Sequence, residues 1–282
     1  MRLSFKTGNA AGAILFGTFI GLAFQTTADA QGEKPLPDFA KAQSAGLGMP
    51  SPFDKFLAID IALKGKVNWK KAYTATAEKV DPDKFSDKEI GIPMALGVRI
   101  ADGVMAVKAR DAESLNQCAD DIEKLARRMG IPDGELRRAR DVRDAANRGE
   151  WLRVFMDLAF FQQDIMRLIR TGDNQTKGTL LIVAGWMQGA RYTSRLITEN
   201  YSPDLSNILR EPLLAKALLD EVKALPAALQ KDPRVARLRE EALPAVYSIV
   251  NVKATEPIAK QRVADLEKIA TQIVKGAVQK NK

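Results

Sequence analysis

Four side chains that could bind an anion recur at helical spacing in one segment of the chain. Gln188, Arg191, Tyr192 and Arg195 are three or four residues apart, so on a helix they share one face. That face would present an amide, a phenol and two guanidinium groups together. Guanidinium groups bind carboxylates and phosphates through paired hydrogen bonds, so we expect these residues to form either a ligand-binding pocket or a structural ion pair.

An acidic partner for this face is available in the preceding segment. Asp157 lies among apolar residues, and a buried carboxylate without a partner would be costly. If 151–170 and 179–200 form a helical hairpin, Asp157 comes level with Arg191 and Tyr192. We therefore predict that Asp157 contacts Arg191 or Tyr192, either in a ligand site or as an ion pair that sets the register of the two helices.

Glycines mark a second feature of the same segment. Gly185 and Gly189 are four residues apart and share a face, where a neighbouring helix could approach closely. The segment 184–189 is also faintly similar to 96–101, because each has a glycine in its second position and each opens a long helix. Coincidence and duplication of a helical-hairpin unit both explain this similarity.

Residues 185–188, Gly-Trp-Met-Gln, resemble the Gly-Leu-Met-Gln element of soluble lytic transglycosylases, a family of α-rich periplasmic enzymes. That family carries a catalytic Glu-Ser pair upstream of the element. None of the nearest upstream acids here, from Glu150 to Asp173, is a Glu followed by Ser. The resemblance therefore supplies no catalytic residue for this chain.

Further chemistry is limited by the residue types that the chain lacks. The sequence contains no histidine, which excludes Ser-His and Cys-His catalytic pairs and any histidine-ligated metal or haem. Its single cysteine, Cys118, lies on an apolar helical stripe, which favours a small buried side chain over a redox or nucleophilic role. We expect no catalytic residue, no metal site and no cofactor.

The pattern of apolar residues predicts an all-α protein. Apolar side chains recur with helical periodicity from Pro52 to Val278, and no segment alternates apolar and polar residues over the length of a strand. The segments 151–170 and 179–200 are apolar around much of their circumference, as is typical of helices buried on several sides. We therefore predict a multi-helix bundle around a central antiparallel hairpin of these two segments. The predicted helices are 52–64, 69–78, 92–109, 112–129, 132–147, 151–170, 179–200, 206–225, 233–252 and 257–278.

The start of the chain has the organisation of a secretory signal peptide. Two basic residues precede an uncharged, mostly apolar run over 10–24, and residues 28–30 (Ala-Asp-Ala) match an A-x-A cleavage site. We expect cleavage between Ala30 and Gln31, with export to a bacterial periplasm or secretion. An uncleaved signal anchor is the alternative.

Three parts follow from these patterns. Residues 1–30 form the predicted signal peptide. Residues 31–51, rich in glycine and proline and without periodicity, are expected to be a flexible leader. Residues 52–282 are expected to form a single α-helical domain.

The charge balance indicates anionic neighbours. The net charge is +8, but the basic residues are dispersed and the export signal points away from the cytosol, so we expect no nucleic-acid partner. The function that we favour is a non-catalytic exported protein that binds a partner or a small anionic ligand in the cell envelope. One alternative is a basic protein associated with an anionic membrane surface, which a basic stripe beside exposed apolar residues would favour. The other is an enzyme that uses carboxylates, such as Asp157 or Asp164 beside Arg191 and Tyr192.

Overall fold

The computed structural model describes residues 52–134, 136–151, 153–154, 157, 175–253 and 255–279. Every regular element in these residues is helical, so the prediction of an all-α bundle is confirmed for them. The predicted signal peptide, the leader and most of the segment 151–170 lie outside the described residues. No described helix is both long enough and apolar enough to cross a bilayer.

The helices follow the predicted order closely, and several of their ends fall within a few residues of the predicted ones. The bounds are α2 (Pro52–Ala62), α3 (Trp69–Thr76), η1 (Pro82–Lys84), α4 (Gly91–Lys108), α5 (Ala112–Met129), α6 (Arg137–Asn147), α8 (Gln175–Glu199), α9 (Pro203–Ser206), η3 (Asn207–Leu209), α10 (Pro212–Lys223), α11 (Ala227–Gln230), α12 (Pro233–Arg237), η4 (Leu238–Ala242), α13 (Leu243–Val250) and α14 (Lys260–Val278).

Local sequence explains where these helices begin and end. The Asp111 carboxylate accepts a hydrogen bond from the Ser114 amide (3.1 Å) and caps α5. Gly130 ends α5 with a left-handed backbone, φ 93°, which a residue without a side chain adopts at little cost. Both features are local, because helix capping depends on residues that are neighbours in the sequence.

The predicted helix 233–252 is continuous but widens in the middle. A π-helical turn, η4, joins α12 to α13, and the Leu243 amide donates to the Leu238 carbonyl. The next residue, Pro244, has no amide proton and cannot donate to the carbonyl four residues before it. The wider turn therefore accommodates Pro244 within a continuous helix.

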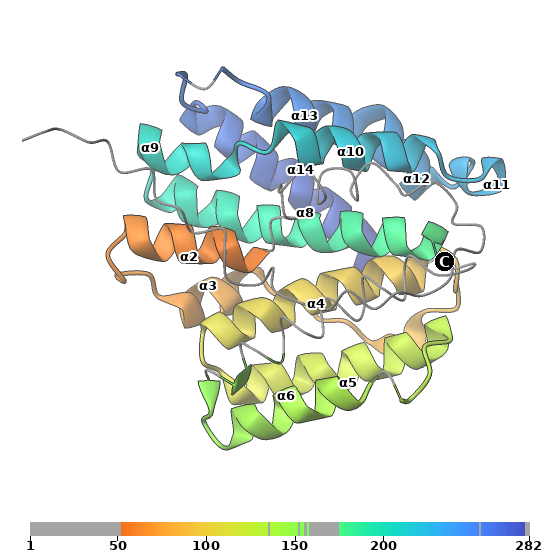
Figure 1. Cartoon of the computed structure of the whole chain (residues 1–282). Helices are drawn as coiled ribbons and strands as arrows, with labels where there is room; N and C mark the ends of the chain where they lie inside the picture. The colour runs from red at the N-terminus through yellow and green to blue at the C-terminus, as the bar shows by residue number, and fades with distance from the viewer. Residues whose placement is uncertain are drawn as a thin grey trace, which may run out of the picture. The chain divides into compact units, whose positions relative to one another are not determined.

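Helix α8 is the centre of the described fold. It is buried along most of its length and packs most extensively against α4 and α14, with α10 also in contact (Figure 1). The predicted partner of α8 in a central hairpin, 151–170, lies mostly outside the described residues. Among the described helices, α4 contributes the closest partner of α8.

Two glycines allow α4 and α8 to touch at backbone distance. A Cβ atom at Gly97 would lie 2.1 Å from the Leu181 carbonyl oxygen, and one at Gly185 would lie 3.0 Å from the Gly97 carbonyl oxygen. The first distance is far inside van der Waals contact, so only glycine fits at Gly97 in this packing. Gly97 and Gly185 occupy equivalent positions, the second residue, in the similar segments 96–101 and 184–189.

The two helices run in the same direction from this crossing. Gly97 lies against Gly185, and further along both helices Asp102 of α4 bonds to Gln188 and Tyr192 of α8. A parallel pair cannot be joined by a short turn. The intervening chain between α4 and α8 accordingly includes the antiparallel helices α5 and α6, with α5 packed back on α4.

Helix α2 is attached to the bundle by two similar clusters of a lysine, a carboxylate and a tryptophan. In the first, Lys55 pairs with Glu211, which also accepts from Trp186 Nε1 at 3.2 Å. The Lys55 ammonium lies 5.2 Å from the centre of the Trp186 ring. Both charged side chains are nearly inaccessible to water, so each depends on the other for its stability.

The second cluster joins α2 to α3 and α4. Asp60 accepts from Trp69 Nε1 at 3.1 Å and from the Lys108 ammonium at 2.5 Å. The same ammonium lies 5.0 Å from the centre of the Trp69 ring. Together the two clusters hold α2, and with it the turn that leads into α3, in a definite place.

We predict that Gly97→Ala lowers the free energy of unfolding by about 3 kcal/mol, because the added methyl group must push α4 away from α8. Gly276→Ala is the matched control: it lies inside α14 with open space around the added atom, and should raise stability by about 0.5 kcal/mol. Chemical denaturation of both variants measures these changes. Equal stability of the two variants would mean that the helices do not cross this closely.

Candidate functional site

A buried carboxylate, Asp102, lies just beyond the glycine crossing and is fully inaccessible to solvent, at 0% exposure. Its Oδ1 accepts hydrogen bonds from Gln188 Nε2 (2.6 Å) and from the Tyr192 hydroxyl (2.8 Å). Its Oδ2 accepts from Arg99 Nη1 (3.1 Å) and from the Glu78 amide (3.3 Å). Four donors from three parts of the chain thus converge on one carboxylate.

Arg99 links this carboxylate to a second one. Its guanidinium donates to the Glu78 carbonyl at 3.1 Å and pairs with Asp121 of α5 at 2.8 Å. Burial raises the pKa of both the Asp102 and Asp121 carboxyls, while the Arg99 guanidinium acts in the opposite direction. The cluster therefore holds two buried carboxylates against one guanidinium and joins α4, α5 and α8.

The single cysteine lies beside this cluster. Cys118 is buried, and its Sγ is 3.5 Å from the Tyr73 hydroxyl. Burial raises the pKa of the Cys118 thiol to about 11, so the thiol stays protonated at neutral pH. Because the thiolate is the reactive form, these surroundings agree with the small buried side chain that the sequence favoured.

The two arginines of α8 extend the network toward the surface. Arg191 pairs with the Glu78 carboxylate at 2.5 Å, and Arg195 donates to the Ala75 carbonyl at 3.1 Å. Arg195 also lies 3.4 Å from the Glu199 carboxylate. On α14, burial raises the pKa of Glu267, which both guanidinium groups counteract. The end of α3 is therefore bound to α8 by charge as well as by packing.

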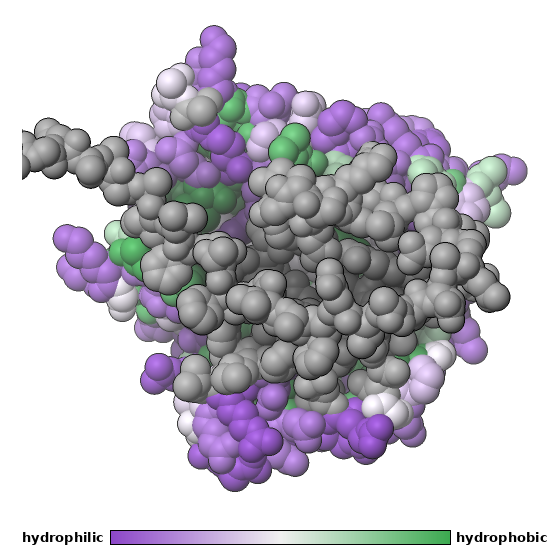
Figure 2. Space-filling view, viewed as in Figure 1, coloured by the Kyte–Doolittle hydropathy of each residue, from purple (hydrophilic) through white to green (hydrophobic). Residues whose placement is uncertain are grey.

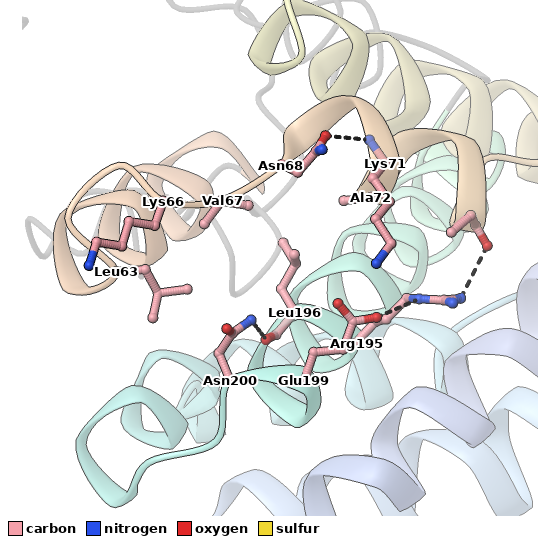
Figure 3. A pocket seen from close by; sticks show the side chains of 11 residues that line it. Leu63, Lys66, Val67, Asn68, Lys71, Ala72, Arg195, Leu196, Glu199 and Asn200 are labelled. Carbon is pink, nitrogen blue, oxygen red and sulfur yellow. Dashed lines mark hydrogen bonds and ion pairs between the residues drawn. The ribbon is translucent and has the colours of Figure 1, made fainter.

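A pocket of about 280 Å³ opens beside Arg195, between α3 and the last two turns of α8. Figure 3 shows the Lys71 side chain reaching from α3 toward Arg195 and Glu199 on α8. The wall combines apolar side chains with three cationic and several polar ones. The lining residues are Leu63, Lys66, Val67, Asn68, Lys71, Ala72, Ala75, Arg195, Leu196, Glu199 and Asn200.

The four side chains singled out on α8 have different roles in this arrangement. Gln188 and Tyr192 both bind Asp102 in the core, whereas Arg191 binds Glu78 near the surface. Of the four, Arg195 alone lines the pocket. The shared helical face is therefore real, but it divides into a buried structural part and a part open to solvent.

The predicted partnership of Asp157 is wrong. Asp157 is half-buried and lies 3.5 Å from Arg153, one turn away on its own segment, whereas Arg191 and Tyr192 bind Glu78 and Asp102. This face of α8 bonds to Asp102 of α4, to Glu78 just after α3 and to Ala75 of α3. Asp164, which the carboxylate-enzyme hypothesis also used, lies outside the described residues.

Sequence reasoning missed the residues that meet this face, namely Arg99, Asp102 and Glu78. Arg99 and Asp102 are three residues apart within an otherwise apolar helix, which is the signal that drew attention to Asp157. The similarity between 96–101 and 184–189 was a second signal. Its glycines mark the crossing, and Asp102 lies one turn beyond Val98 toward Gln188.

The buried network and the pocket differ in their access to solvent. Asp102 is sealed from solvent and already accepts four hydrogen bonds, so it cannot reach a substrate. Among the described residues, no cluster of three or more cysteine and acidic side chains is arranged to hold a metal ion. The pocket, in contrast, presents cations to solvent beside apolar side chains.

Comparison of this chain with family models, with curated proteins and with solved structures found no match. The function of the protein is therefore inferred from its own residues and their geometry.

We predict that Asp102→Ala lowers the free energy of unfolding by about 3 to 5 kcal/mol, because it removes the shared acceptor of Gln188, Tyr192 and Arg99. Thermal and chemical denaturation test this. Asp120→Ala is the control, since that carboxylate is 53% exposed and its pair with Arg143 should contribute less than about 1 kcal/mol. A variant of Asp102 that melts like the wild type would contradict the role of this network.

Proposed function

We propose that the protein is an exported, non-catalytic helical protein that binds a small anionic ligand in the pocket between α3 and α8. The observation that carries this proposal is the placement of Lys66, Lys71 and Arg195 around one concave surface. A site lined by several cations attracts carboxylates and phosphates, and a guanidinium can bind them through two hydrogen bonds.

The charge of the pocket is not neutralised within the described residues. Neither the Lys66 nor the Lys71 ammonium has an ion-pair partner there, and Glu199 is the one acidic side chain of the lining. Arg195 is shared between Glu199 and the Ala75 carbonyl, which orients its guanidinium along the pocket wall (Figure 3). An anion entering the pocket would meet two uncommitted ammonium groups.

The apolar part of the wall limits the ligand further. Leu63, Val67 and Leu196 contribute aliphatic surface next to the cations. Ligand sites of this kind use apolar surface for affinity and a few polar groups for orientation. The ligand class that fits is a small anion with an apolar portion, such as a medium-chain carboxylate.

A binding role rather than catalysis is supported by the residue types of the lining. The pocket contains no cysteine, serine or histidine, and its single carboxylate, Glu199, already lies beside Arg195. The wall therefore lacks a thiol or serine nucleophile, and its one carboxylate is already paired with a guanidinium. Asp157, one of the two carboxylates that the carboxylate-enzyme hypothesis offered beside Arg191 and Tyr192, does not line the pocket.

Export to the periplasm, or secretion, belongs to the same proposal and rests on the sequence. The apolar run over 10–24 and the Ala-Asp-Ala of 28–30 support it. A ligand-binding protein in the cell envelope meets small anions before they enter the cell.

We predict that hexanoate binds to the purified protein and that hexylamine, with the same chain length and the opposite charge, does not. Lys71→Gln and Arg195→Gln should each weaken hexanoate binding by about tenfold, since each removes a charged partner of the carboxylate. Isothermal titration calorimetry at low salt measures these affinities.

Lys268→Gln is the matched control for this experiment, because it removes one exposed lysine from α14, outside the pocket lining. It should leave hexanoate binding unchanged. Equal binding of hexanoate and hexylamine, or equal loss in the control and in Lys71→Gln, would argue against an anion site in this pocket.

We predict that the protein recovered from the cell envelope begins at Gln31, because a signal peptidase cleaves after the Ala-Asp-Ala of 28–30. N-terminal sequencing of the envelope fraction checks this directly. Substitution of Ala30 by Arg should block cleavage and leave the precursor in the membrane fraction. A protein that starts at Met1 in the cytosol would contradict export.

A further inference from the structure

Helix α2 presents two large aliphatic side chains to solvent. Leu57 is 46% exposed and Ile61 is 71% exposed, and their spacing of four residues places them on one face of the helix. The opposite face of α2 is buried, since Lys55, Phe56 and Ile59 pack into the bundle. The outer pair of aliphatic side chains therefore contributes nothing to the core of the described fold.

Lysines lie directly beside this apolar pair along the chain. Lys64, Lys66, Lys70 and Lys71 follow α2 in the turn to α3 and in the first turn of α3, and all four are exposed. The sequence has no acidic residue between Asp60 and Glu78. Figure 2 shows hydrophobic and strongly hydrophilic atoms side by side at the edge where Figure 1 places the end of α2.

The orientation of this basic segment is set by the fold. The turn after α2 contains left-handed backbone at Lys64 (φ 54°) and at Gly65 (φ 69°), which reverses the chain. Trp69 is held by Asp60, so the start of α3 returns beside the end of α2. Both the apolar pair and the lysines thus belong to one small region of the surface.

We propose that this region, comprising Leu57, Ile61 and the lysines from 64 to 71, docks the protein onto an anionic lipid bilayer. Charge complementarity selects the occupant, because four exposed lysines with no acidic residue between them in the sequence attract the negative surface potential of acidic lipids, although Lys70 also pairs with Asp111 at 3.5 Å. The aliphatic pair would enter the boundary between headgroups and acyl chains, while the lysine ammonium groups stay at the phosphates. Such binding is peripheral and reversible.

This docking is separable from ligand binding in the pocket. Lys66 and Lys71 line the pocket, but Leu57, Ile61, Lys64 and Lys70 do not. Substitutions restricted to the second group therefore test the membrane surface without removing a pocket cation.

The test measures co-sedimentation of the full chain, purified with the N-terminus that the cell produces, with phospholipid vesicles. The protein should bind vesicles of phosphatidylglycerol mixed with phosphatidylcholine, bind weakly to phosphatidylcholine alone, and dissociate at high salt. Replacing both Lys64 and Lys70 by Gln should weaken binding by about 25-fold, at about fivefold for each lysine near an anionic surface. Replacing both Leu57 and Ile61 by Ser should weaken it by at least about tenfold.

The matched control replaces Lys268 and Lys275 of α14 by Gln, which removes the same charge from another surface. It should bind the mixed vesicles within about twofold of the wild type. Circular dichroism and melting curves verify that the variants remain folded, as expected for exposed positions. The proposal is overturned if the wild type does not bind the mixed vesicles, if it binds both vesicle types equally, or if the α14 control loses as much binding as the variant at Lys64 and Lys70.

Discussion

The rest of the described structure depends on how closely α4 and α8 approach one another. At Gly97 and Gly185 the two backbones are in contact, and a single added methyl group at Gly97 would collide with the Leu181 carbonyl. So close a crossing brings polar groups together with no room for solvent between them. Asp102 then becomes compatible with the core only because its four donors are fixed at the same place. The close packing of α4 on α8 and the hydrogen bonding of Asp102 therefore depend on each other.

The network around Asp102 explains why the surface pocket has a stable form. Glu78 contributes its amide to Asp102, its carbonyl to Arg99 and its carboxylate to Arg191, so the chain just after α3 is anchored at three points. Arg195 continues the same face of α8 and bonds to Ala75 one turn before Glu78. The wall of the pocket is thus an extension of the core network. For the ligand binding that we propose, a wall held in this way would lose little conformational entropy when the ligand enters.

The two clusters that hold α2 have a comparable consequence on the other side of α3. Lys55 with Glu211 and Asp60 with Lys108 place both ends of α2 against the bundle, while two tryptophan rings cover the ammonium groups. The ammonium groups of Lys55 and Lys108 are paired with carboxylates and largely buried. The lysines of the following turn remain available to solvent, beside the aliphatic residues that α2 turns outward. The buried ion pairs of α2 therefore position the exposed lysines of the turn that follows it.

The sequence by itself determined the helical class, the order of the helices and several of their ends. Periodicity, the Asp111 cap and the glycine at position 130 are local properties, and local physics is sufficient to interpret them. The sequence also singled out the polar face of α8 and, with Gly189, Gly185 as a place of close approach, whereas Gly97 appeared only in a faint similarity between two segments. It predicted Asp157 as the partner of Arg191 or Tyr192, whereas Arg191 pairs with Glu78 and Tyr192 donates to Asp102.

Only the tertiary structure decided which acids these are. In the sequence, Asp102 and Asp157 look alike, since each is an acidic residue in an otherwise apolar segment. Which of them bonds to the polar face of α8 depends on which helix packs against that face. That choice follows from the crossing of Gly97 with Gly185, whose closeness is a property of two segments far apart in the chain. The pocket likewise combines residues near 70 with residues near 195, and no local pattern links them. Helix formation is a matter of neighbours in sequence, whereas the pairing of helix faces depends on the total packing and hydrogen bonding of the folded chain.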